Sequence, residues 1–100
     1  MKLDTEKYLL QNEISVTHKE YNRARDRLHI KECVIEWIKT QLNEMGESHP
    51  KYGAYLADKN RIENDVIASK YLCLQTKERF RLAQRNYARF MKTDGKRLIV

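Results

Sequence analysis

Glycine and proline are scarce in this chain, whose 100 residues include three glycines and one proline. A β-sandwich or β-barrel needs a turn signal about every 8–12 residues, so this scarcity excludes both architectures. The length allows one small domain at most, which also disfavours a doubly wound α/β enzyme. The sequence contains no glycine-rich phosphate loop and no dinucleotide-binding fingerprint.

Long apolar runs and cysteines are also rare. No run of about 18 apolar residues occurs, which excludes a membrane-spanning helix. Four of the first seven residues are charged, so we expect no secretory signal and a cytoplasmic location. The two cysteines, Cys33 and Cys73, are too few for a disulfide scaffold, and we interpret them as small apolar fillers.

The apolar residues that are present recur at alternating steps of three and four, which is the heptad pattern of a coiled coil. The first seam has nine apolar residues at eleven positions, namely Leu10, Ile14, Thr17, Tyr21, Ala24, Leu28, Lys31, Ile35, Ile38, Leu42 and Met45. The second seam has eight at eleven positions, namely Tyr55, Lys59, Ile62, Val66, Ser69, Cys73, Thr76, Phe80, Ala83, Tyr87 and Phe90. Both segments are therefore predicted to be long helices.

The predicted fold is all-α, with the two helices folded back as an antiparallel, coiled-coil-like hairpin. We expect a single domain over residues 1–100. Its parts are a helix over about 4–45, a turn over about 46–53, a helix over about 54–93 and a short tail over 94–100.

Particular residues mark the expected ends of the helices. Asp4 or Thr5 is a suitable N-terminal cap for the first helix. Gly46 follows the last seam residue, where a left-handed backbone conformation costs glycine least. Ser48 or His49 is expected to cap the second helix.

The pairing of the two helices has two candidate registers, one heptad apart. The register that we favour places large residues against small ones, with Phe80 opposite Ala24. The alternative places Glu32 against Glu63, where like charges repel.

Apolar residues also occur outside the two seams. Leu9, Val16, Ile30 and Trp37 repeat at heptad spacing in the first helix. A lone hairpin would leave several of them in water, although burying one such side chain gains about 1.5–3 kcal/mol. A second hairpin could cover them in a dimeric four-helix bundle, the tail over 96–100 could fold back, or a different protein could dock. The predicted protein interface consists of Ile30, Val34, Trp37, Ile67, Tyr71 and Leu74.

The charge of the chain is unevenly distributed. Residues 1–65 carry eleven basic and twelve acidic groups, whereas residues 66–100 carry nine basic and two acidic groups, so their net charges are −1 and +7. Such asymmetry indicates an anionic partner, which is nucleic acid, an acidic protein surface or a membrane surface, and of these we do not expect a membrane. The predicted anion-binding cluster consists of Arg23, Arg25, Arg27, Lys77, Arg79, Arg81, Arg85 and Arg89.

Catalytic chemistry is not indicated anywhere in the sequence. His29 and Cys33 have the spacing of two metal ligands on one helix, but no second pair follows, so we expect no metal site, cofactor or small-molecule substrate. The predicted function is non-catalytic: a small accessory or inhibitory protein that docks on a larger protein, with a nucleic-acid-handling protein as one option, through the apolar patch and the basic cluster. The alternative is direct, weakly sequence-specific binding of nucleic acid through phosphate contacts.

Overall fold

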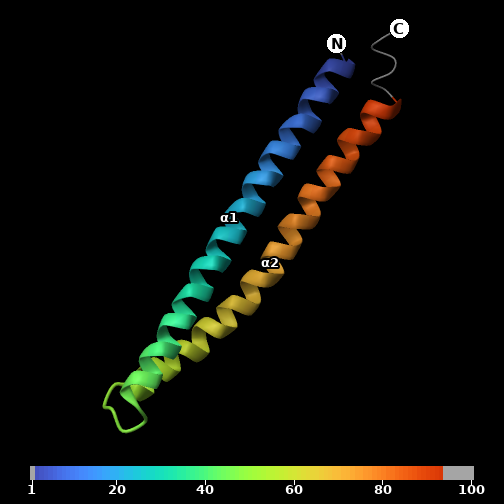
Figure 1. Cartoon of the computed structure of the whole chain (residues 1–100). Coiled ribbons are helices and arrows are strands. Elements are labelled where there is room, and N and C mark those ends of the chain that lie inside the picture. The colour runs from blue at the N-terminus through green and yellow to red at the C-terminus, as the bar shows by residue number, and fades with distance from the viewer. Residues whose placement is uncertain (1, 94–100) are drawn as a thin grey trace. The chain divides into compact units, whose positions relative to one another are not determined.

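The computed structural model describes residues 2–93 and shows two helices joined by one turn (Figure 1). Helix α1 spans Lys2–Met45 and helix α2 spans Tyr52–Thr93, and they form a hairpin, which confirms the predicted all-α fold. Helix α1 begins two residues before its predicted start, so Asp4 and Thr5 lie within the helix and do not cap it. The predicted tail over 94–100, including its fold-back, lies outside the described residues.

The turn has the backbone conformation that its sequence predicts. Gly46 has a φ of 75°, which is the left-handed region that only glycine adopts at little cost, and its N–H donates to the carbonyl of Leu42 at 3.2 Å. Of the two predicted caps for α2, His49 takes the role, because its ring Nδ1 accepts a hydrogen bond from the Lys51 N–H at 3.1 Å. The second helix therefore begins before Gly53, two residues earlier than predicted.

The core of the hairpin lies along the two predicted seams. Every buried side chain among residues 4–93 belongs to one of them: Thr17, Ala24, Ile35, Ile38, Leu42, Val66, Ser69, Thr76, Ala83 and Phe90. The remaining seam residues are half-buried. The heptad spacing thus identifies the buried stripe of each helix residue by residue.

Polar residues in the seams form hydrogen bonds within one helix or across to the other. The hydroxyl of Thr17 donates to the carbonyl of Glu13 in the same helix at 2.7 Å. The Lys31 ammonium donates to the hydroxyl of Ser69 across the hairpin at 2.9 Å, while its stem fills a seam position. These bonds let polar side chains occupy a narrow core without leaving a buried group unsatisfied.

Contacts divide the chain into two compact units. Within the described residues, 24–73 form the turn unit, and 2–23 together with 74–93 form the terminal unit. Each unit pairs a segment of α1 with a segment of α2, so each has its own stretch of the two seams.

In the terminal unit, the register differs from the favoured prediction. The ring of Phe80 lies 4.9 Å from that of His18 and 6.3 Å from that of Tyr21. The side-chain amide of Gln11 donates to the hydroxyl of Tyr87 at 3.1 Å. These contacts fit the alternative register, shifted by one heptad, in which Phe80 faces the turn of α1 around Thr17. The predicted pairing of Phe80 with Ala24 is wrong.

The short turn explains this register. Helix α1 ends at residue 45 and α2 begins at residue 52, so the turn is centred between Ser48 and His49. The predicted register would place Tyr55 opposite His49, whereas the ring of Tyr55 packs edge-on against Trp37 at 6.1 Å. Glu63 forms an ion pair with Lys59 at 3.6 Å, which compensates the expected repulsion only in part because the pair is partly exposed.

Candidate functional site

The apolar residues outside the seam of α1 are exposed on one face of the turn unit. Ile30 is 61% exposed, Trp37 is 54% exposed and Val34 is 37% exposed. Each of the three immediately precedes a seam residue of α1, so all three lie on the same side of the helix. The indole of Trp37 is held by its edge-to-face contact with Tyr55, which is a half-buried seam residue.

The corresponding residues of α2 do not join this face. Val34 immediately precedes a seam residue of α1, whereas Ile67 immediately follows the seam residue Val66 of α2. In an antiparallel helix pair, positions that precede such seam residues on both helices share one face, and positions that follow them share the opposite face. Ile67 and the neighbouring Tyr71 therefore point away from Trp37, although both are exposed.

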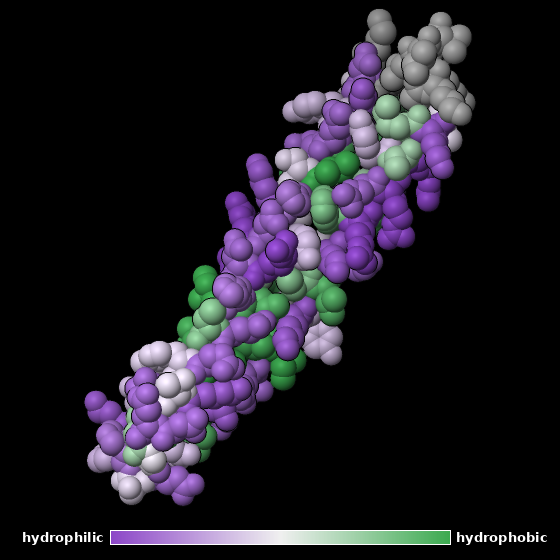
Figure 2. All heavy atoms as spheres, viewed as in Figure 1, coloured by the Kyte–Doolittle hydropathy of each residue, from purple (hydrophilic) through white to green (hydrophobic). Residues whose placement is uncertain are grey.

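The predicted interface is thus split into separate surfaces. We define the Trp37 face as Ile30, Val34 and Trp37. Leu74, which is also exposed, belongs to the terminal unit. Figure 2 shows the same dispersal, because hydrophobic side chains reach the surface in patches among hydrophilic ones.

The predicted basic cluster is divided between the two units. Arg25 and Arg27 belong to the turn unit, and the other six members belong to the terminal unit. Of these six, Lys77 is half-buried, and Arg23, Arg79, Arg81, Arg85 and Arg89 are exposed.

Four cations follow the outer side of α2, opposite its seam. They are Arg81, Arg85, Arg89 and Lys92, and we call them the outer ridge. Lys92 is missing from the predicted cluster, although its spacing of seven from Arg85 places both at the same heptad position. A shallow hollow between Arg81 and Arg85 is also lined by Glu78, Gln84 and Ala88.

The outer ridge works against the stability of α2. Like charges four residues apart, as in Arg81 and Arg85, oppose helix formation by about 0.2–0.5 kcal/mol per pair. Glu78 is the one acidic residue of the segment 74–93, and its carboxylate lies 3.6 Å from Arg81. Both partners of that pair are more than half exposed, so it compensates little.

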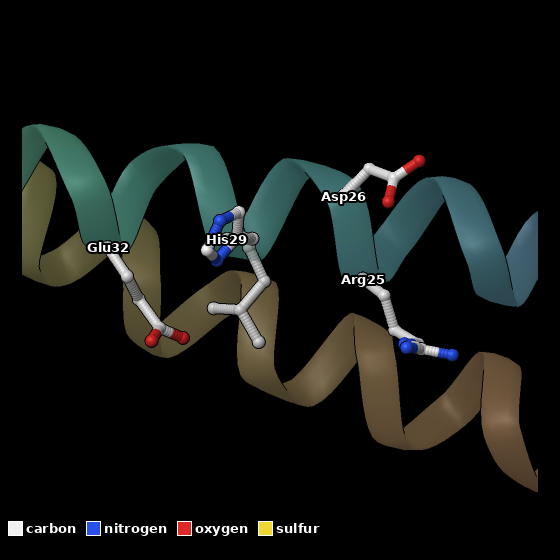
Figure 3. Close-up of a pocket in the computed structure, with 5 residues that line it drawn as sticks. Arg25, Asp26, His29 and Glu32 are labelled. Carbon is white, nitrogen blue, oxygen red and sulfur yellow. The ribbon is translucent and has the colours of Figure 1, made fainter.

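A second shallow hollow, on α1, does not assemble a reactive site. It is lined by Arg25, Asp26, Leu28, His29 and Glu32. Arg25 and Glu32 project from one side of the helix and Asp26 from the other, so the charged groups do not converge (Figure 3). His29 Nε2 lies 3.7 Å from the Cys33 thiol, but the described residues contain no group of three side chains that could hold a metal ion.

Within residues 2–93, neither helix is apolar enough over a sufficient length to cross a membrane. No protein-family model, curated protein or solved structure matches this chain.

Proposed function

We propose that this protein is a non-catalytic interaction module that docks on a larger partner protein through the Trp37 face. The observation that carries the proposal is the exposure of Trp37 and Ile30, at 54% and 61%, beside a seam that is already filled. Aromatic residues on a well-supported surface are typical anchors of protein interfaces. The contact with Tyr55 limits the conformational freedom that Trp37 would lose on binding.

The chemistry of the face defines the partner. Burial of one aliphatic side chain gains about 1.5–3 kcal/mol, so covering the three residues of the face is strongly favourable. Charged residues of both signs border the face, including Arg61 and Asp58, which lie 3.4 Å apart. The partner should therefore present an apolar pocket with a mixed polar rim.

The net charge disfavours a second copy of the chain as the occupant. Each chain carries a net charge of +6, which opposes association of two copies at long range, while the eight basic and eight acidic groups of residues 24–73 leave the surroundings of the face neutral. We therefore assign the Trp37 face to a different protein, and the predicted dimeric four-helix bundle becomes the competing outcome of the test.

Differential capture followed by calorimetry tests the proposal. The full chain is immobilised beside two variants, Trp37→Glu and Ile67→Glu, which place the same charge on opposite faces. A partner is expected to bind the wild type and Ile67→Glu and to be lost with Trp37→Glu, while circular dichroism shows equal helicity. With the purified partner, Trp37→Ala should weaken binding by about 2 kcal/mol or more, roughly 30-fold.

Two results would overturn the proposal. One is identical capture by both variants. The other is a wild-type mass in light scattering that corresponds to a dimer and falls to a monomer only with Trp37→Glu, because the face would then be covered by a second copy.

A further inference from the structure

We propose that the outer ridge of α2 binds the phosphate backbone of double-stranded nucleic acid. This function goes beyond protein docking, because the ridge lies in the terminal unit and the Trp37 face lies in the turn unit. The ridge residues Arg81, Arg85, Arg89 and Lys92 are all exposed, and they point away from the seam that pairs with α1.

The charge of the chain is concentrated at this ridge. Residues 1–73 carry twelve basic and twelve acidic groups and are neutral, whereas residues 74–93 carry six basic groups and one acidic group, a net charge of +5. A general need for solubility would not concentrate +5 of the net charge of +6 in one segment of twenty residues. Such a local concentration is the electrostatic footprint of a polyanion-binding surface.

Helix stability does not account for the ridge. Cations in the last turn of a helix interact favourably with its dipole, and this explains Lys92 near the end of α2 at Thr93. The dipole effect is confined to the last turn, so it does not explain Arg81 and Arg85, which lie further from that end. Repulsion between these two like charges therefore destabilises α2, and the helix dipole does not compensate it.

The spacing of the ridge suits a nucleic-acid strand. Residues 81 to 92 rise about 16 Å along the helix, at about 1.5 Å per residue. One strand of a duplex carries a phosphate about every 3.4 Å of its axis, so the ridge spans about five phosphates and each of its four cations can contact one of them. Three of the four are arginines, whose planar guanidinium donates two hydrogen bonds to one phosphate.

The surroundings of the ridge allow a phosphate to reach its arginines. Ala88 and Gln84 lie in the hollow between the guanidinium groups and leave room for a phosphate to approach. The weak pair of Glu78 with Arg81 can be exchanged for a phosphate contact.

Single-strand binding requires aromatic stacking platforms, but Phe80, Tyr87 and Phe90 are seam residues that are buried or half-buried. Binding should therefore depend on the backbone, with little sequence preference.

Fluorescence anisotropy with the full chain and a labelled 20-base-pair duplex of arbitrary sequence tests this proposal. Four phosphate contacts predict a slope of about −3.6 in a plot of log affinity against log salt concentration, or roughly a 100-fold loss between 50 and 200 mM NaCl. The ridge variant Arg81→Gln/Arg85→Gln/Arg89→Gln should reduce the slope to about −1. The control Lys19→Gln/Lys39→Gln/Arg61→Gln removes the same charge elsewhere and should retain the slope.

The alternatives give different results. Equal losses in both triple variants would show that binding follows net charge alone and would overturn the proposal. Absence of duplex binding at 50 mM NaCl, with ridge-dependent binding of poly-glutamate, would assign the ridge to an acidic protein instead. Trp37→Ala should bind the duplex as the wild type does, so failure of the docking proposal is distinguishable from failure of this one.

Discussion

Two isoleucines of α1 provide the sharpest test of which surface is the core. Ile38 is 3% exposed, whereas Ile30 is 61% exposed. Replacement by alanine removes three carbon atoms, and at about 0.8 kcal/mol per buried CH₂ this costs about 2.4 kcal/mol at Ile38. A residual cavity adds to that cost, so we expect about 2.5–3 kcal/mol. The side chain of Ile30 is only about two fifths buried, so its replacement loses about two fifths of that burial free energy. The higher helix propensity of alanine regains a few tenths of a kcal/mol, which leaves a net loss of about 0.5 kcal/mol.

Urea unfolding followed by circular dichroism at 222 nm, at two protein concentrations, measures both losses. In thermal melts the same variants should lower Tm by about 10–20 °C for Ile38→Ala and about 2–4 °C for Ile30→Ala. Equal losses would show that Ile30 is covered in solution and would refute its assignment to a free face. A loss below about 1 kcal/mol at Ile38 would refute the seam as the core.

Other features of the hairpin give further predictions. Gly46→Ala should lower the free energy of unfolding by about 1 kcal/mol, because residue 46 has a left-handed conformation. Gly53→Ala should raise it by about 0.5–1 kcal/mol, because residue 53 lies within α2 and has open space around it. Urea titrations compare the two variants. A double-mutant cycle of His18→Ala and Phe80→Ala should give a coupling of about 0.5–1.5 kcal/mol, and zero coupling would contradict the observed register. Lys31→Leu should raise Tm by extending the seam, and a lower Tm would show that its hydrogen bond outweighs apolar packing.

The seams could be predicted residue by residue because heptad spacing determines which side of a helix is buried. The register could not, since a slip of one heptad again places apolar residues opposite apolar ones. The large–small criterion does not separate the two registers either: Phe80 meets the small Ala24 in one and the small Thr17 in the other. The turn decides between them, because helix ends at residues 45 and 52 centre the hairpin between Ser48 and His49.

The candidate site was predicted in part. Exposure of Ile30 and Trp37 follows from their positions outside the seam, and the structure bears this out. Their separation from Ile67 also follows from heptad position, but only after the helices are treated as an antiparallel pair. The division of the chain into two units has no such signal in the sequence, because both helices continue through it without a break.

That division has a consequence for the order of folding. The turn unit is one uninterrupted stretch of fifty residues, 24–73, whereas the terminal unit joins two separate segments. Closing an unfolded connection of that length costs about 3.5 kcal/mol of chain entropy. The turn unit is therefore expected to form first, since its own helices are joined by a short turn. Changes at Gly46 should then alter the folding rate, while changes at Phe90 should act mainly on the unfolding rate.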